Sequence, residues 1–194
     1  MDALAYPGCG LKRMEEADPR GETLMKSAQE KMGMVPNMYA AMANFSPLLD
    51  AYVHGYELFR SESGFSMMEQ EVVFLAISYE NNCDYCMAAH SFVADIMSHV
   101  PAEITDALRD GRELPDPRLQ ALSSLAKSLV IKRGNPDGEE IQAFLAAGYT
   151  QNQILSLVLA VGIKTLSNYS NHLLKTPLDA AFKGRSWDGP VTET

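Results

Sequence analysis

Apolar residues recur along most of the chain with the three- and four-residue spacing of amphipathic helices. The clearest case is 116–133, where one side of the expected helix carries Leu119, Leu122, Leu125, Ala126 and Leu129. Further helices are expected over 24–32, 101–110, 139–147 and 151–174. No segment shows the alternation and β-branched enrichment that are typical of a strand. The pattern therefore predicts an all-α fold.

Residue types that favour helix ends mark several boundaries. Ser66 precedes Glu69 by three residues, which is the spacing of a capping box, and an apolar run follows. Ser46 precedes a proline and is expected to be the N-cap of another helix. Asn81 and Asn82 favour caps over helix interiors, so we expect them to end or sharply bend the helix that follows Ser66.

The chain resembles itself at an offset of 84 positions (148 minus 64). This offset aligns 64–66 with 148–150 and sets the tetrapeptide CDYC (83–86) on SNYS (167–170), so each cysteine meets a serine. Chance similarity between two apolar helices is one explanation. The other is two related helical hairpins that face each other across an approximate two-fold axis, with thiols in one copy and hydroxyls in the other.

The length and composition fit a single globular domain. The chain has 194 residues, of which 46% are hydrophobic and 21% are charged, enough for one domain with a substantial core. We expect an N-terminal arm over 1–20, one helical domain over 21–183 and a C-terminal tail over 184–194.

The charge and the apolar runs argue against several classes of partner. The formal net charge is −9 and no segment clusters Lys and Arg, which argues against nucleic acid and anionic membranes. The N-terminus lacks the basic start and apolar run of a secretory signal. No apolar stretch reaches the roughly 18–20 residues that span a bilayer. We therefore expect a cytoplasmic protein, where disulfides are reduced and a close cysteine pair is catalytic or metal-binding.

The segment ENNCDYCMAAH (80–90) places a cysteine pair and a histidine close together. The spacing of Cys83 and Cys86 allows a small disulfide ring, and the start of a helix would favour the reactive thiolate. His90 follows Cys86 by four residues and so shares its helix face, where an imidazole can accept the thiol proton or stabilise the thiolate. The third cysteine, Cys9, is interpreted as incidental.

The spacing of these residues is compatible with three interpretations of the segment. A zinc site would use Cys83, Cys86 and His90, with a remote fourth ligand such as Glu71, His54, His99 or His172. A redox switch or an oligomeric scaffold would need only the dithiol. A thiol enzyme would also need proton-handling groups. Glu71 lies twelve residues before Cys83, about 120° away on a straight helix, so it is either a solvated residue or is turned back by a bend.

The pattern of Glu71, eleven residues, Cys83-Asp84-Tyr85-Cys86, three residues and His90 resembles the active-site signature of the AhpD-like alkylhydroperoxidases. These belong to the carboxymuconolactone decarboxylase superfamily. The segments SMMEQEVVFLAIS and NYSNHLLKTPLDAAF are similar to an uncharacterised peroxidase-related branch of that superfamily, and the resemblance covers 35–182.

The resemblance implies an all-helical, AhpD-like subunit with internal pseudo-symmetry, assembled into dimers, trimers or hexamers. It further implies an oxidoreductase that reduces alkyl hydroperoxides. Cys86 would attack the peroxide, Cys83 would resolve the sulfenic acid as a disulfide, and His90 and Glu71 would relay protons. An external dithiol, lipoyl-type or thioredoxin-like, would then reduce the disulfide. We expect no bound cofactor, because no nicotinamide or flavin fingerprint is present.

Tyr85 departs from the signature, because the best-known peroxidase of this group has a histidine immediately before its second cysteine. Tyrosine is not a base near neutrality, so Tyr85 either donates a hydrogen bond at the thiolate as an auxiliary residue or packs in the core. His172 follows the SNYS segment and either lines the same cavity or is an interior histidine. Carboxymuconolactone decarboxylases generally lack the cysteine pair, which argues against lyase activity.

Overall fold

The structure is a computed structural model that describes residues 9–190. The all-α prediction is confirmed, since every regular element over this range is helical. The α-helices are α1 Pro19–Met32, α2 Asn37–Met42, α3 Ser46–Glu62, α4 Met67–Glu80, α5 Asp84–Ile96, α6 Ala102–Asp110, α7 Pro117–Ile131, α8 Gly138–Ala146 and α9 Gln151–Leu174. Short 3₁₀ helices are η1 Met14–Glu16, η2 Ala43–Phe45 and η3 Ala180–Arg185.

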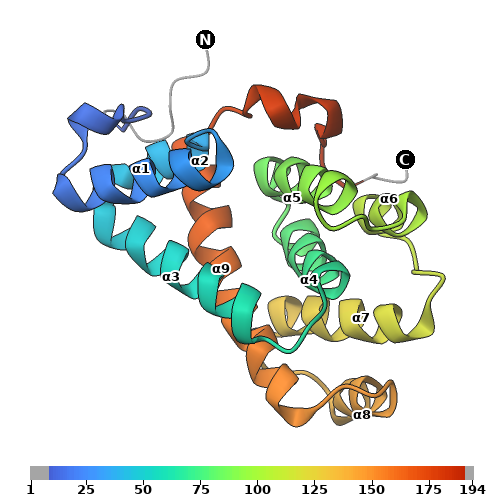
Figure 1. The fold of residues 1–194 in the computed structure, drawn as a ribbon. Coiled ribbons are helices and arrows are strands. Elements are labelled where there is room, and N and C mark those ends of the chain that lie inside the picture. The colour runs from blue at the N-terminus through green and yellow to red at the C-terminus, as the bar shows by residue number, and fades with distance from the viewer. Residues whose placement is uncertain (1–8, 191–194) are drawn as a thin grey trace.

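The central helix of the fold is α4, which packs against α5, α6, α7 and α9 (Figure 1). Residues 72–77 of α4 are fully buried on every side. A helix that is covered all round must be apolar all round, as the run VVFLAI is. The position of α4 in the middle of the molecule therefore follows from its composition.

The outer helices surround this centre in two groups. On one side α3 and α9 pack together, with α1 against α3 and α2 against α9. On the other side α8 covers α7, and the C-terminal segment returns from α9 to lay η3 on α5 (Figure 1). Within 9–190 no single helix is long and apolar enough to cross a membrane, and α8 with α9 meets that test only as a pair bent by 116°.

The capping box on α4 is confirmed. The Ser66 hydroxyl accepts from the Glu69 amide, and the Glu69 carboxylate accepts from the Ser66 amide. The prediction that Ser46 is an N-cap is wrong, because Phe45 occupies that position and Ser46 is already helical. The Ser46 hydroxyl instead donates to Asp18, which caps α1. The Ser46 hydroxyl therefore bonds to a side chain that is remote in the sequence, Asp18, instead of to the backbone at the start of its own helix.

The break between α4 and α5 lies where the two asparagines predicted it. Asn81 is the C-cap of α4, Asn82 has a positive φ of 53°, and α5 begins at Asp84. Asparagine tolerates this left-handed conformation better than most residues. The Asn81 side chain also donates to Asn168 of α9 at 2.8 Å, which fixes the break against a neighbouring helix.

The two copies of the predicted repeat begin with the same capping box, but only one of them has a break in the helix that follows. Thr150 and Gln153 form on α9 the same capping box as Ser66 and Glu69 on α4, 84 positions later. However, α9 continues without interruption past the point that corresponds to the α4–α5 break. The two-fold relation between the copies stays a prediction.

The predicted arm and tail both contact the helical domain. The helix α1 starts at Pro19 rather than after residue 20, because Asp18 accepts from the Gly21 amide and proline suits the first helical turn. In the tail, the Trp187 indole donates to the Arg109 carbonyl at 2.9 Å. Residues 1–8 of the arm and 191–194 of the tail lie outside the described residues.

Candidate active site

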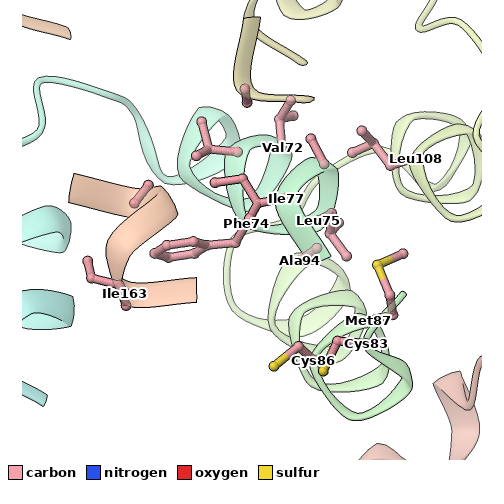
Figure 2. Close-up of a cluster of buried hydrophobic side chains, with 14 of the residues drawn as sticks. Val72, Phe74, Leu75, Ile77, Cys83, Cys86, Met87, Ala94, Leu108 and Ile163 are labelled. Atoms are coloured by element: carbon pink, nitrogen blue, oxygen red, sulfur yellow. The ribbon is translucent and has the colours of Figure 1, made fainter. Parts of the chain in front are cut away.

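The two cysteines of the CxxC segment occupy the N-terminal end of α5. Cys83 is the N-cap and Cys86 lies in the first turn, where the helix dipole favours negative charge. Both are buried, with exposed fractions of 0% and 2%, and both are free thiols. Figure 2 shows their sulfur atoms close together beside the apolar cluster around Phe74 and Met87. The pair is near but not bonded.

Helix α9 supplies the polar groups around the Cys86 sulfur. The Asn171 side-chain amide donates to that sulfur at 3.4 Å. The Ser167 hydroxyl lies 3.9 Å from the same sulfur. Both contacts come from the α9 segment that aligns with the cysteine segment in the predicted repeat, so the serine that replaces the first thiol lies against the second thiol.

A lysine that the sequence analysis did not single out lies buried beside this site. Lys164 of α9 is 1% exposed, and its ammonium group has no hydrogen-bond partner among the described residues. The ammonium lies 5.4 Å from the centre of the Phe74 ring, which itself packs against His90. The signal in the sequence was a single lysine within a mostly apolar stretch, LAVGIKTL.

The pKa values of the two thiols are shifted in opposite directions. Burial alone would raise the pKa of Cys86, but the hydrogen bond from Cys83 and the positive charges of Lys164 and His90 outweigh it and hold the pKa well below its usual range. The same hydrogen bond, together with burial, raises the pKa of Cys83. Of the two thiols, Cys86 is therefore the one that ionises more readily and Cys83 the one that retains its proton.

The structure brings Glu71 and His90 together, although they come from different helices. The Nδ1 atom of His90 lies 2.9 Å from Oε2 of Glu71, and Glu71 is fully buried rather than solvated. The other carboxylate oxygen, Oε1, forms an ion pair with Arg60 at 2.5 Å. The break between α4 and α5 folds the helices back on each other, which turns Glu71 toward His90.

This pairing fixes the tautomer of the imidazole. Burial would raise the pKa of Glu71, but the hydrogen bond to His90 and the charges of His90 and Arg60 outweigh it, so its pKa is lowered and it is ionised. Burial and the charge of Lys164 lower the pKa of His90. When His90 is neutral it donates from Nδ1 to the carboxylate, which leaves Nε2 free to accept a proton. When it is protonated, its charge stabilises the Cys86 thiolate and the Glu71 carboxylate.

Arg60 is the second residue that the sequence analysis missed. It lies on α3, where its guanidinium donates to the Tyr56 hydroxyl at 2.7 Å and to the Gln70 side chain at 2.9 Å. These bonds hold Arg60 against Glu71, so the carboxylate is fixed from two sides. Nothing in the local sequence distinguishes this arginine from a solvated one, because the carboxylate that it pairs with, Glu71, lies on the next helix.

The Tyr85 hydroxyl is bonded away from the thiols. It donates to Oδ2 of Asp179 at 2.5 Å and accepts from the Met38 amide at 3.2 Å. Asp179 also accepts from the Asn37 amide, so these contacts connect α5, α2 and the segment before η3. The predicted auxiliary role of Tyr85 at the thiolate stays a prediction, and these contacts give it a role in packing.

The remaining histidines lie away from the Glu71–His90 pair. The Nε2 atom of His172 lies 3.2 Å from the Asn82 carbonyl, near the start of α5, whereas His54 and His99 are exposed. Within residues 9–190, no group of three or more His, Cys, Asp or Glu side chains has an arrangement that would hold a metal ion. The zinc interpretation therefore has no ligand set in this part of the chain.

Comparison with known proteins identifies the fold. No family model matches the sequence, and no curated protein matches it. A crystal structure from Ralstonia eutropha JMP134, described as an alkylhydroperoxidase AhpD core and an uncharacterised peroxidase-related protein, superposes with a TM-score of 0.80 at 20% identity, over 97% of this chain and 100% of that one. An uncharacterised peroxidase-related protein from Silicibacter sp. TM1040 gives 0.76 at 23% identity, over 95% and 96%.

A third solved structure has a different described activity. The debrominase Bmp8, a cysteine-to-alanine variant in complex with 2,3,4-tribromopyrrole, superposes with a TM-score of 0.77 at 16% identity, over 95% of this chain and 97% of that one. Similarity at these identities establishes a shared fold. The AhpD-like helical fold that the sequence predicted is confirmed.

Proposed function

We propose that this protein is a thiol-dependent oxidoreductase that reduces alkyl hydroperoxides through a dithiol–disulfide cycle of Cys83 and Cys86. The observation that carries the proposal is the unequal environment of the two thiols. Cys86 lies in the first turn of α5 and its sulfur accepts from the Asn171 amide at 3.4 Å, which favours the thiolate. Accordingly the pKa of Cys86 is lowered, whereas that of Cys83 is raised. A two-cysteine peroxidase needs this difference, because one sulfur attacks the peroxide and the other then reacts with the sulfenic acid that forms.

In the first step the Cys86 thiolate attacks the terminal oxygen of the hydroperoxide. The O–O bond breaks, an S–O bond forms, and Cys86 becomes a sulfenic acid while an alkoxide leaves. That alkoxide takes up one proton. His90 is the proton carrier, because its free Nε2 can hold the proton released by the Cys86 thiol and return it to the leaving oxygen. Glu71 stabilises the imidazolium form during this transfer.

In the second step the Cys83 sulfur displaces water from the sulfenic acid and the disulfide forms. The proton of the Cys83 thiol leaves with the hydroxide, so the step is balanced. An external dithiol then reduces the disulfide by exchange and is itself oxidised. We propose a lipoyl-type or thioredoxin-like donor for this step, and a homo-oligomer as the working form.

The test is peroxide turnover by variants of each cysteine. With an organic hydroperoxide and a dithiol reductant, wild type and Cys9→Ser turn over at equal rates, whereas Cys86→Ser falls to background. Cys83→Ser forms a sulfenic acid at Cys86, detected by mass spectrometry after dimedone trapping, but forms no intramolecular disulfide. Background consumption by the wild type, or full turnover by Cys86→Ser, would refute the proposal.

A reductive dehalogenase is the second candidate, because the fold is shared with a debrominase. Replacement of a carbon–bromine bond by carbon–hydrogen also requires two electrons, which oxidation of the two thiols to a disulfide supplies, with bromide and a proton as co-products. Incubation with a brominated pyrrole and measurement of released bromide separates the two. Bromide release without peroxide turnover would favour this candidate.

A further inference from the structure

A cavity of about 330 Å³ lies on the surface near the thiolate. Its walls come from the turn between α4 and α5, the C-terminal end of α9 and the tail at 188–189. The sulfur atoms themselves are buried, so a substrate needs a route through the surrounding side chains. The cavity reaches the surroundings of Cys86 through Asn171, which forms part of its lining.

Asn171 belongs both to the cavity wall and to the thiolate site. The residue is 4% exposed, its Nδ2 donates to the Cys86 sulfur at 3.4 Å, and its side chain lines the cavity. A thiolate accepts hydrogen bonds, so the amide nitrogen faces the sulfur and the amide oxygen faces elsewhere. That oxygen is buried and has no hydrogen-bond partner among the described residues.

A second unpartnered polar atom lies in the same wall. The Thr176 side chain lines the cavity, and its Oγ1 is buried without a hydrogen-bond partner in the described chain. Buried polar atoms without partners are rare in folded proteins, because each forfeits its hydrogen bond to water. The Asn171 oxygen can only accept, whereas the Thr176 hydroxyl can donate or accept.

We propose that this cavity is the route by which the hydroperoxide reaches Cys86, and that Asn171 binds its O–O–H group against the sulfur. The inference rests on the proposed function. In this arrangement the substrate hydroxyl donates to the Asn171 oxygen, while the Asn171 amide continues to donate to the thiolate. The terminal peroxide oxygen is thereby held next to the nucleophile, and Thr176 offers a further hydrogen bond.

The lining also defines the class of substrate. Acidic Asp84 and Asp188 and basic Lys175 border the cavity, and its volume is near the lower limit of about 300 Å³ for small-molecule pockets. A long apolar chain would desolvate these charges without replacing their hydrogen bonds. The site therefore fits small, polar organic hydroperoxides and discriminates against hydroperoxides of long-chain lipids.

The route is tested by the chemical accessibility of Cys86, which does not require any enzyme activity. Alkylation by iodoacetamide, mapped to Cys86 by mass spectrometry, is followed for Thr176→Trp and Asp188→Trp, which fill the cavity. Each slows alkylation on the order of tenfold relative to wild type. The matched control Lys183→Trp lies on the same C-terminal segment but outside the cavity, and leaves the rate unchanged. Unchanged alkylation in both folded cavity variants would overturn the route.

The role of Asn171 is tested by comparing two reactions of the same sulfur. Asn171→Leu removes the hydrogen bond to the thiolate and the acceptor for the substrate, and it retains most of the volume. Loss of the thiolate bond lowers the rates of alkylation and of hydroperoxide reduction together. Loss of the acceptor for the substrate lowers the rate of hydroperoxide reduction by a further factor on the order of tenfold. This factor corresponds to about 1.4 kcal/mol, the contribution of one hydrogen bond.

Parallel decreases in the two rates would show that Asn171 does not bind the substrate. If the wild type reduces no hydroperoxide, the proposed function fails, but the alkylation rates of the cavity variants still decide whether the cavity leads to Cys86. The two failures are therefore distinguishable.

Discussion

At the scale of a single residue, Lys164 stands out because it is buried and its ammonium group has no hydrogen-bond partner among the described residues. Burial of such a group raises the free energy of the folded state unless another group compensates its charge. The group that compensates its charge is the Cys86 thiolate, whose pKa it lowers. The lysine lies on α9, whereas the thiolate that it stabilises lies on α5. The positive charge of Lys164 thus stabilises the buried thiolate.

Lys164→Met raises the pKa of Cys86, because it removes a positive charge and retains a side chain of similar length. The thiolate fraction near neutrality falls on the order of tenfold for each unit by which the new pKa exceeds the ambient pH. Alkylation of Cys86 measured against pH reports the shift. Lys183→Met removes an exposed charge and serves as the control. An identical pH profile in Lys164→Met would contradict the pairing.

Glu71→Gln tests the proton-handling pair. Glutamine retains an acceptor for His90 but cannot stabilise the imidazolium or neutralise Arg60. We expect kcat/KM for a hydroperoxide to fall on the order of 100-fold, the lower limit for loss of general acid–base catalysis. Glu57→Gln, which alters an exposed ion pair with Lys31, leaves it unchanged. Wild-type activity in Glu71→Gln would remove Glu71 from the mechanism.

At the scale of elements, the start of α5 is fixed by two kinds of contact. The break after α4 sets where the helix begins, and the Tyr85 hydroxyl binds it to the segments around Asp179 and Met38. These contacts explain how a tyrosine occupies the position next to the thiolate. Its ring remains in the core and its hydroxyl satisfies a buried carboxylate.

Tyr85→Phe separates packing from chemistry. Loss of the bond to Asp179 lowers the free energy of unfolding by about 2 kcal/mol, as expected for a buried hydrogen bond to a charged group. Peroxide turnover is unchanged if the role is structural. The control is Tyr169→Phe, the exposed counterpart 84 positions later, which changes neither quantity. A loss of turnover with the stability retained would assign Tyr85 to the chemistry.

The predicted repeat also has a consequence at this scale. Phe65 and Tyr149 are counterparts at the 84-position offset, and their rings are in contact, with centroids 5.8 Å apart. A two-fold axis between the copies would bring such counterparts together, but one contact does not establish the axis, and the symmetry stays a prediction. Beyond it the copies diverge, because the two asparagines break one helix whereas the other continues.

For the whole molecule, the buried pair of Glu71 and His90 makes stability depend on pH. The pKa of His90 is lowered by folding, so below the unfolded value of about 6.5 the unfolded chain binds more protons and stability falls. The pKa of Glu71 is also lowered, so its contribution is present above the unfolded value of about 4.3 and is lost as the pH falls through the folded value.

We therefore expect the urea midpoint to decrease as the pH falls from 7 to 5, with no opposing contribution from this pair. His90→Gln removes the first effect and gives a flatter profile over that interval. His54→Gln, which replaces an exposed histidine, retains the slope of the wild type. Equal slopes in His90→Gln and the wild type would show that His90 does not control the acid response.

The sequence was most informative where the physical cause was local. The capping box at Ser66 and the break at the asparagines depend on neighbouring residues, and both were predicted. Ser46 was assigned wrongly because its partner, Asp18, is remote in the chain. Arg60 and Lys164 were missed for the same reason, since the charge that each one serves lies on a different helix.

The chain by itself determined the helical period, the helix boundaries and the presence of two thiols with an imidazole one turn away, because backbone hydrogen bonds and side-chain spacing act over a few residues. Tertiary structure decided which thiol carries the charge, which tautomer the imidazole adopts and which side chains of α9 surround the sulfur. Those properties depend on burial and on electrostatic fields between helices, and both arise only when the helices pack.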